Sequence, residues 1–224
     1  MAPRLTLVVP VLNEAACIRE ALAALAPLRT RGHEVIVVDG GSTDDTVELA
    51  APLCNQVVHA PRGRALQMNA GARVASGEAL VFLHADTRLP ERADEEMARA
   101  LAQASWGRFD VRIASSRLLL ALVARAMNLR SRLSGIATGD QAIFVRREAF
   151  PGFPEIPLME DIAFSRRMKR RGRPACLRAC VTTSARRWEA RGVVRTILLM
   201  WRLRLLYALG MTPQRLAREY ADQR

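Results

Sequence analysis

Lysine is almost absent from this chain of 224 residues. Lysine and arginine together number 34, and Lys169 is the single lysine, so nearly every cationic side chain is a guanidinium group. The cations are also unevenly placed. Residues 1–110 contain 11 arginines and 14 acidic residues, whereas residues 111–224 contain 23 cations and 8 acidic residues. A strongly basic second half favours an anionic partner, such as a phosphorylated substrate or lipid headgroups.

Cysteine and aromatic residues are scarce as well. The 4 cysteines form no CxxC pair and have no histidine at zinc-ligand spacing, which disfavours a zinc knuckle. Unpaired, reduced thiols predict a cytoplasmic protein. Aromatic residues make up only 5% of the chain, and no nucleic-acid-binding module is recognisable, so we expect no nucleic-acid partner.

No apolar run is both long enough and free enough of charge to predict a membrane-spanning helix. The run at residues 5–12 lacks the small residues of a signal-peptide cleavage site and is better explained as a strand. The run at residues 193–209 contains Arg195, Arg202 and Arg204, and each charge at mid-bilayer costs about 2.5 kcal/mol or more. On a helical wheel, Arg195 and Arg202 lie on one side of this segment and Arg204 lies opposite.

The first half alternates apolar runs with helix signals. Strands are predicted at residues 5–9, 34–38, 56–59 and 79–83, the first two of them buried. Helices are predicted between them at residues 13–26, 42–53 and 64–75, with Asn13 as an N-cap and Ser42 with Asp45 as a capping box. This alternation predicts an α/β fold in which crossover helices join parallel strands. After residue 105 the pattern weakens, with strands predicted at 109–113 and 141–146 and helices at 118–133, 162–171 and 193–209.

Two acidic residues follow predicted strands. Asp39 comes directly after Val38, and Asp86 lies three residues after Leu83. Ligands of open parallel sheets bind beyond the carboxyl ends of the strands, so both acids are candidates for a binding site, although each also fits a turn or cap position. The turn after the first strand contains Pro10 rather than GxGxxG, and the chain has no P-loop, which disfavours nicotinamide and P-loop nucleotides.

Four spaced motifs occur in order: residues 9–14 (VPVLNE), 38–44 (VDGGSTD), 83–87 (LHADT) and 160–161 (ED). Together they resemble the motifs of family 2 glycosyltransferases with the GT-A fold, and in particular the small bacterial radical-SAM/selenodomain-associated transferases. The resemblance implies one α/β domain over residues 1–224, with a GT-A (Rossmann-like), mostly parallel central sheet flanked by helices and followed by C-terminal helices. Residues 1–110 would bind the nucleotide sugar, and the basic residues 111–224 would form the acceptor side.

The resemblance also implies roles for individual donor-site residues. Pro10 and Glu14 would contact the nucleoside of an activated sugar, and Asp39 would hydrogen-bond its base. Arg64 would face the diphosphate at the N-terminus of a helix. Asp86 matches the last acid of the family's Asp-x-Asp motif, which holds Mn²⁺ or Mg²⁺ against the diphosphate of the leaving group.

His84 departs from the family pattern, because it stands where the first acid of Asp-x-Asp is expected. Imidazole can ligate Mn²⁺, so one interpretation makes His84 a metal ligand beside Asp86. In the other interpretation, His84 hydrogen-bonds the ribose or the backbone. The sequence leaves both open.

Asp161 matches the catalytic base of the family. In an inverting transfer, a carboxylate takes the proton from an acceptor hydroxyl as that oxygen attacks the anomeric carbon. Capping of the following helix is the structural alternative for Asp161 and its neighbour Glu160. Between the metal motif and this acid pair, contact with the acceptor is expected from Gly139, Asp140 and Gln141.

The segment Arg186-Arg187-Trp188 resembles the end of the Gln-x-x-Arg-Trp motif of processive synthases. Ser184 occupies the glutamine position, and the multi-span channel of those enzymes is not predicted, so we do not expect processive synthesis. Arg187 and Trp188 are candidates for acceptor or diphosphate contact, and a solvated basic surface is the alternative.

The resemblance therefore implies metal-assisted, inverting transfer of a sugar from a nucleotide-sugar donor to a hydroxyl or lipid-linked acceptor. One alternative is a nucleotidyltransferase-like enzyme, although the glycine-rich basic loop expected after its first strand is missing. The other is a non-catalytic protein that binds nucleotide sugars or anionic lipids. Residues 118–133 and 193–209 are either interfacial helices on the inner face of the cell membrane or helices of the core or of a homodimer interface, with snorkelling arginines.

Overall fold

The computed structural model describes residues 3–221, without the side chains of Arg187 and Arg191. Its strands are β1 (Leu5–Val11), β2 (Glu34–Asp39), β3 (Gln56–His59), β4 (Ala79–Phe82), β5 (Thr87–Arg88), β6 (Trp106–Ala114), β7 (Ile143–Arg146) and β8 (Ala175–Ser184). Its helices are α1 (Ala15–Ala23), α2 (Ala26–Thr30), α3 (Thr46–Ala50), α4 (Arg64–Val74), α5 (Ala93–Leu101), α6 (Leu118–Ser134), α7 (Glu160–Lys169), α8 (Arg186–Arg191), α9 (Val193–Ala208) and α10 (Pro213–Ala221). Short 3₁₀ helices include η2 (Gly139–Gln141).

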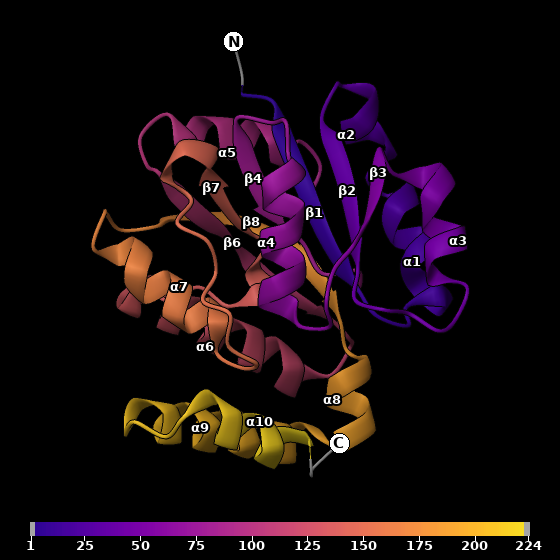
Figure 1. The fold of residues 1–224 in the computed structure, drawn as a ribbon. Coiled ribbons are helices and arrows are strands. Elements are labelled where there is room, and N and C mark those ends of the chain that lie inside the picture. Colours follow the sequence, from indigo (N-terminus) through magenta and orange to yellow (C-terminus); the bar gives the residue numbers. More distant parts are fainter. Residues whose placement is uncertain (1–2, 222–224) are drawn as a thin grey trace.

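The strands form one sheet in the order β3-β2-β1-β4-β7-β6-β8-β5 (Figure 1). The first four of these are parallel to one another, as the alternation in the sequence predicted. β7 runs antiparallel to both of its neighbours, β4 and β6, while β6 and β8 are parallel. The carboxyl ends of β1, β2, β4, β6 and β8 therefore meet at one edge of the sheet, where β7 begins.

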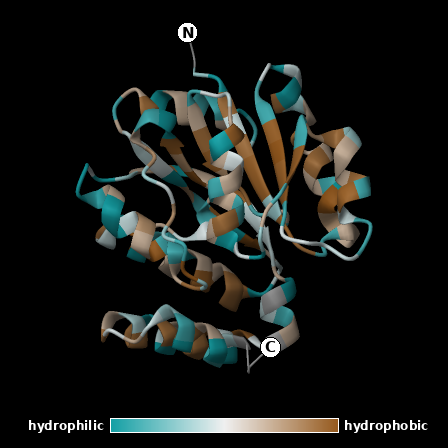
Figure 2. Ribbon diagram, in the orientation of Figure 1, coloured by the Kyte–Doolittle hydropathy of each residue, from teal (hydrophilic) through white to brown (hydrophobic). Residues whose placement is uncertain are grey.

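Alternate residues of the central strands pack into cores on opposite faces of the sheet. On one face, Leu7 and Val9 of β1 pack with Ile18 of α1 and Met97 of α5. On the other face, Val8 joins a core that includes residues of α4 and α7. Because both faces are covered, the strands are almost continuously apolar, and Figure 2 shows them as the hydrophobic centre of the molecule.

The loops after β1 and β2 are joined by hydrogen bonds, which corrects two predicted helix caps. The N–H of Asn13 donates to Ser42 Oγ at 2.9 Å, and the N–H of Thr43 donates to Asn13 Oδ1 at 2.8 Å. Asn13 and Ser42 thus use their side chains between loops, and α1 and α3 begin further along the chain than predicted. Glu14 and Asp45 occupy the N-cap positions, and neither makes a side-chain cap bond.

Two further predictions differ from the structure, and one long strand was not predicted. The helix expected through Ala26 ends at Ala23, and Pro27 lies in the first turn of a separate helix, α2, where its missing N–H is tolerated. Gln141 belongs to η2 rather than to the strand that follows it. The strand β8 was not predicted, because its partly exposed residues lack a continuous apolar run.

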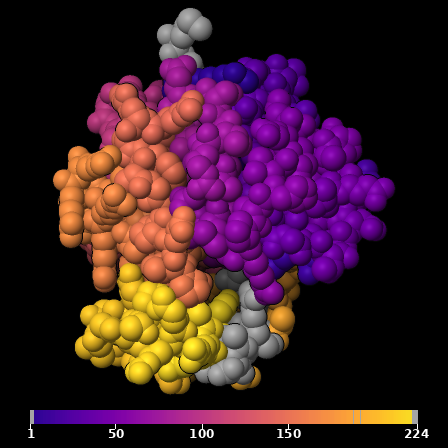
Figure 3. Space-filling view, viewed as in Figure 1, coloured from indigo at the N-terminus to yellow at the C-terminus, as the bar shows by residue number. Residues whose placement is uncertain are grey.

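The C-terminal helices form a layer against the rest of the molecule. Leu199 and Leu203 of α9 and Leu216 of α10 pack with Met159 and Ile162 at the start of α7. In Figure 3 this layer, coloured yellow, lies beneath the body that holds the sheet. Within residues 3–221, no helix combines the length and apolar composition needed to cross a bilayer.

Candidate active site

Asp39 ends β2 at the sheet edge where the parallel strands terminate. It is 3% exposed, and its carboxylate accepts hydrogen bonds from the N–H groups of Gly41 and Ser42, each at 3.0 Å. Burial raises the pKa of Asp39, but the hydrogen bonds from Ser42 and Gly41 outweigh it, so the pKa lies below its ordinary value. The side chain is therefore a preorganised anion at the predicted nucleoside position.

Pro10 and Glu14 lie at the same edge, Pro10 within β1, which continues past its predicted end to Val11, and Glu14 in the turn that follows. Pro10 pairs with Val38 in the β1–β2 register, and Glu14 precedes α1. Glu14 Oε2 lies 3.4 Å from Nη2 of Arg186, which is 172 residues away in the sequence. Arg186 thus joins the start of α8 to the predicted donor side, a contact that no local sequence signal indicates.

The N-terminus of α4 is fixed against β1 and β2 by Gln67. Its Nε2 donates to the carbonyl oxygens of Val11 and Val38, both at 2.8 Å. A Cβ on Gly40 would lie 2.9 Å from the Gln67 amide carbon, so this close approach requires glycine. One turn before Gln67, Arg64 begins the helix and faces the acid pair of α7.

Arg64, Glu160 and Asp161 come together beside Gly139. Arg64 Nη1 lies 3.6 Å from Glu160 Oε1, and Asp161 Oδ2 accepts a hydrogen bond from the Gly139 N–H at 3.0 Å. Burial lowers the pKa of Arg64, but the charges of Glu160, Asp140 and Asp161 keep it above its ordinary value. Capping of α7 therefore does not account for the whole environment of the acid pair, because both carboxylates also contact groups outside α7.

Glu160 is 4% exposed, and its pKa is raised to about 7 by burial and by the charge of Asp161, against the opposing charge of Arg64. The residue before it, Met159, has φ +69°, a left-handed conformation that a side chain of this size rarely adopts. Met159 is buried against α9 and α10, and this packing holds the strained turn in place.

His84 lies directly over Gly139. A Cβ on Gly139 would be 2.7 Å from His84 Nε2, so only glycine leaves room for the ring. On its other side, His84 Nδ1 lies 3.6 Å from Asp140 Oδ1. Asp86, two residues further along the chain, shares a cavity with Asp140. The structure therefore places His84 between Asp140 and the pocket that contains Asp161, while Asp86 and Asp140 line the larger cavity.

The described residues include no group of three or more histidine, cysteine or acidic side chains close enough to hold a metal ion by themselves. The donors present still suit Mg²⁺ or Mn²⁺, because such ions are commonly bound by one or two carboxylates together with substrate phosphates and water. Asp86 and Asp140 are carboxylates, and His84 offers a ring nitrogen near Asp140. A metal shared between these residues and a diphosphate fits the site.

A cavity of about 440 Å³ opens beside Asp86 and Asp140. Its other walls come from the end of β8 and from α6, α8, α9 and α10, and they are mostly apolar. Trp188, one of the predicted contact residues, lines it. The volume lies within the range of small-molecule sites, and the cavity adjoins the candidate base side of the site through Asp140 and His84.

Two arginines of this cavity come from different helices, Arg130 from α6 and Arg204 from α9. Burial and the charge of Arg204 lower the pKa of Arg130 to about 10. Burial likewise lowers the pKa of Arg204, against the charges of Asp161 and Asp140. Arg195 and Arg202 are exposed, so the predicted opposite placement of Arg204 is confirmed.

Comparisons with known proteins show the family and the fold of the chain. The family model described as Glycosyl transferase family 2 matches residues 6–119, which is just over half of the chain. The chain belongs to glycosyl transferase family 2. The matched segment contains the donor-side residues and ends before Asp140 and Asp161.

Two curated relatives of this family 2 chain carry glycosyl-transfer names. A PGL/p-HBAD biosynthesis glycosyltransferase of Mycobacterium bovis is 34% identical over 108 residues, which is 45% of this chain and 41% of the relative. An undecaprenyl-phosphate 4-deoxy-4-formamido-L-arabinose transferase of Yersinia enterocolitica is 28% identical over 160 residues, or 64% of this chain and 48% of the relative. The chain thus spans less than half the length of these relatives.

A solved mannosyltransferase from Pyrobaculum calidifontis, in complex with GDP-Man and Mn²⁺, superimposes with a TM-score of 0.65 and 21% sequence identity. The match covers 100% of this chain and 70% of the mannosyltransferase. At this identity the likeness establishes the fold, and the predicted GT-A fold is confirmed.

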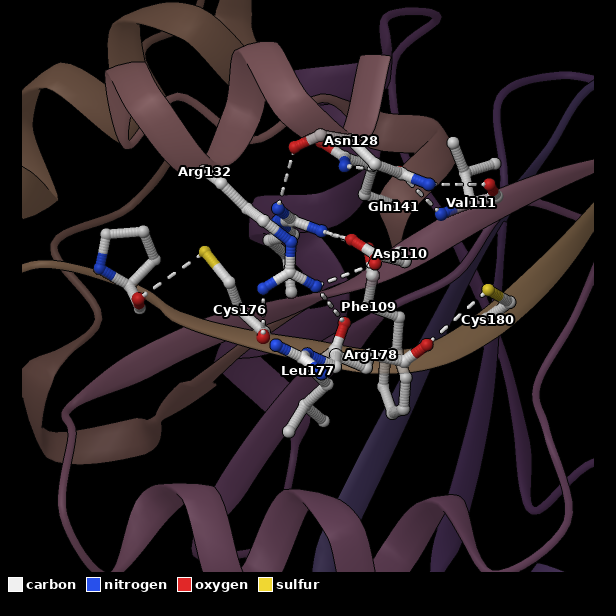
Figure 4. A network of polar contacts seen from close by, with 12 residues as sticks. Phe109, Asp110, Val111, Asn128, Arg132, Gln141, Cys176, Leu177, Arg178 and Cys180 are labelled. Atoms are coloured by element: carbon white, nitrogen blue, oxygen red, sulfur yellow. Dashed lines mark hydrogen bonds and ion pairs between the residues drawn. The ribbon is translucent and has the colours of Figure 1, made fainter. Parts of the chain in front are cut away.

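The side chain of Gln141 is buried and holds other parts of the protein together, so it does not make the predicted contact with the acceptor. Gln141 is 0% exposed, its Oε1 accepts a hydrogen bond from the Thr138 N–H, and its Nε2 donates to Asn128 Oδ1 at 3.4 Å. Asn128, on α6, also bonds both backbone groups of Val111 on β6 (Figure 4). In this family 2 chain, Gln141 therefore links η2 to α6 and cannot reach a ligand.

The remaining predicted contact residue, Arg187, belongs to α8, and its side chain lies outside the described part of the chain. Three residues that sequence reasoning left out of the site are Arg130, Arg186 and Arg204. A basic second half was the only available signal for them, and it did not distinguish these arginines from the exposed ones.

Proposed function

We propose that this chain transfers a glycosyl group from a nucleotide-diphosphate sugar to a hydroxyl acceptor, with inversion at the anomeric carbon. The observation that carries the proposal is the position of Asp161. It is held by Gly139 next to His84, in a pocket shared with Arg64 and Glu160. The contact of His84 with Asp140 joins this pocket to the mostly apolar cavity that Asp86 and Asp140 line. A base at that junction can reach a nucleophile that enters from the cavity.

In the proposed reaction, the donor half of the chain, residues 1–110, binds the nucleotide. Asp39 accepts hydrogen bonds from the base, while Pro10 and Glu14 border the nucleoside. Arg64 compensates negative charge that develops on the departing diphosphate. Mg²⁺ or Mn²⁺, held by Asp86 with His84 or Asp140, would supply further charge neutralisation. The complexes of related structures with Mn²⁺ support this assignment.

Asp161 acts at the acceptor. Its carboxylate takes the hydroxyl proton while the acceptor oxygen forms a bond to the anomeric carbon, and the bond from that carbon to the diphosphate oxygen breaks. The electron pair of the broken bond leaves with the nucleoside diphosphate. The acceptor half, residues 111–224, would provide the cavity, with Trp188 in its wall.

Binding of nucleoside diphosphates tests the donor side. With ligand at about 100 times its Kd and Mn²⁺ present, we expect the melting temperature to rise by roughly 5–10 °C, because a ligand that binds only the folded state stabilises it by about 2.7 kcal/mol. Asp86→Asn should remove the part of the shift that requires Mn²⁺. The exposed Asp45→Asn serves as the matched control and should keep the full shift. If no nucleoside diphosphate raises the melting temperature, the proposal is wrong.

We also propose that the acceptor is lipid-linked and that α6 and α9 touch a membrane surface. The exposed large apolar residues of the described chain, apart from Val74, all lie on these two helices or directly after α9: Leu118, Leu119, Leu122, Leu129, Leu133, Val194, Leu198, Trp201, Leu205 and Leu209. We call this set the α6–α9 apolar face. Exposed Arg125, Arg195 and Arg202 on the same helices suit anionic headgroups. The name of the Yersinia relative, which contains a lipid phosphate, supports a lipid-linked acceptor.

Flotation with vesicles that contain anionic lipid tests the membrane contact. We expect recovery with the lipid at low salt, and less recovery in high salt because headgroup attraction is screened. The double variant Leu198→Glu/Leu205→Glu should stay in solution, whereas Val74→Glu, on an exposed site of α4, should float like the parent chain. No lipid recovery at low salt, together with a dimer by light scattering, would identify the face as a homodimer interface instead.

A further inference from the structure

The cavity between α6 and α9 contains buried cationic donors without partners. In the part of the chain that the structure describes, Nε and Nη2 of Arg130 and Nε of Arg204 are buried and have no hydrogen-bond partner. A buried polar group without a partner costs about 1–3 kcal/mol, and more when it is charged. Folding alone gives no reason to place two such groups in one mostly apolar cavity.

The two guanidinium groups also repel each other. The charge of Arg204 is the second cause, after burial, of the lowered pKa of Arg130. The acids that act on both arginines, Asp140 and Asp161, belong to the proposed reaction centre. An anion bound between the arginines would provide acceptors for the buried donors and reduce the repulsion. Phosphate suits this position, because its several oxygens match the planar donor groups of arginine.

The rest of the cavity is mostly apolar and suits an apolar part of a ligand. Near the arginines its walls include Met127, Ile197 and Met200, which offer only apolar surface to a ligand. Leu122 and Trp201 also line the cavity, and both belong to the exposed α6–α9 apolar face, so apolar surface continues from the cavity to the outside. A ligand that matches the whole cavity has an anionic group at the arginines and an apolar chain that leaves along this face.

We infer that the acceptor carries a phosphate group on an apolar chain, and that Arg130 and Arg204 bind this phosphate in the cavity between α6 and α9. That the bound molecule is the acceptor rests on the proposed function. That Arg130 and Arg204 bind a phosphate on an apolar chain does not depend on the proposed function. The arginines act as binding residues that place the acceptor beside Asp86, Asp140 and Asp161. They replace Gln141 as the polar groups that recognise it.

Intrinsic fluorescence of the full chain measures this binding. Of the 3 tryptophans, Trp188 and Trp201 line the cavity, while Trp106 is buried in the core. Octyl phosphate, octanol and inorganic phosphate are titrated below the aggregation concentration of each amphiphile. We expect octyl phosphate to bind at least tenfold more tightly than either of the others. Equal binding of octyl phosphate and inorganic phosphate would point to a soluble phosphate ligand and would overturn the lipid part of the inference.

Variants separate recognition from folding. Arg130→Met and Arg204→Met should each weaken octyl phosphate binding roughly ten- to hundredfold, the range expected for lost hydrogen bonds to a charged group. Their melting temperatures should be unchanged or higher, because each substitution removes a buried donor without a partner. Arg73→Met, on an exposed site of α4 away from the cavity, is the control and should bind octyl phosphate like the parent chain.

Two further results would overturn the inference. In the first, octyl phosphate and octanol bind the parent chain equally well. In the second, Arg130→Met and Arg204→Met lose nucleoside diphosphate binding as strongly as octyl phosphate binding, which would assign the arginines to the donor diphosphate. The melting shift with nucleoside diphosphates is read separately. Its absence refutes the proposed function, whereas its presence together with either result above refutes only this inference.

Discussion

Replacing Asp161 by asparagine is expected to lower kcat roughly 100- to 10,000-fold, the usual contribution of a positioned general base. Asparagine has the same shape, and its side-chain oxygen can still accept the Gly139 N–H, so the loop that carries Asp140 should stay in place. The melting shift with nucleoside diphosphate should therefore match that of the parent chain. Release of nucleoside diphosphate from candidate nucleotide sugars, with water as the acceptor, provides an assay that needs no knowledge of the natural acceptor.

Glu160→Gln is the matched control for this prediction. Glu160 faces Arg64, and because burial and the charge of Asp161 raise its pKa to about 7, a large fraction of Glu160 is protonated at neutral pH. We expect Glu160→Gln to keep most of the activity. If Asp161→Asn stays fully active while Glu160→Gln loses activity, the base has been assigned to the wrong carboxyl.

The same control has a pH signature in stability. A carboxyl whose pKa is raised on folding stabilises the folded state while it is protonated, and this contribution is lost as pH rises from about 4.5, its ordinary pKa, through about 7. The glutamine of Glu160→Gln cannot ionise, so the variant does not lose this contribution. As pH rises across this interval, the unfolding free energy of the variant should therefore increase relative to that of the parent chain. Urea unfolding at several pH values measures the difference.

Asp110→Ala is expected to lower the unfolding free energy by about 3–5 kcal/mol, the usual cost of leaving a buried charge without its partner. Arg108 is 0% exposed, and its guanidinium pairs with Asp110, which also accepts a hydrogen bond from Arg132 at 2.6 Å. Figure 4 shows Asp110 and Arg132 where β6 meets α6. A loss of that size is a large part of the 5–15 kcal/mol by which a typical domain is stable.

Two comparisons make the Asp110 prediction specific. Removing both charges in Arg108→Met/Asp110→Ala should recover most of the lost stability, because the fully buried charge of Arg108 is removed together with its partner. Arg132 also loses Asp110, but it is partly exposed and keeps its hydrogen bonds to the carbonyl oxygens of Cys176 and Leu177. Glu96→Ala, which breaks an exposed ion pair with Arg99, should change stability by about 1 kcal/mol or less. Urea denaturation compares the three variants. The explanation is wrong if Asp110→Ala is as stable as Glu96→Ala, or if the double variant is as unstable as Asp110→Ala.

Local patterns were reliable where each residue's environment follows from its neighbours in the chain. The four parallel strands, the acid at the end of β2 and the helices around Arg64 and Asp161 were predicted, because a strand covered on both faces must be apolar and a polar residue after it must lie at the rim. The helical wheel separated Arg204 from Arg195 and Arg202 for the same reason, since a helix fixes the direction of each side chain relative to the others.

By itself, the sequence determined the fold class, the family and the edge of the sheet where the acids gather. The tertiary structure decided which polar residues can meet a ligand. It buried Gln141 against Asn128 and joined Glu14 to Arg186 across most of the chain. It also brought Arg130 and Arg204 from two separate helices into one cavity. Contacts between distant segments depend on how the elements pack. The sequence alone does not distinguish Arg130 and Arg204 from the exposed arginines, and only packing buries their guanidinium nitrogens beside one cavity.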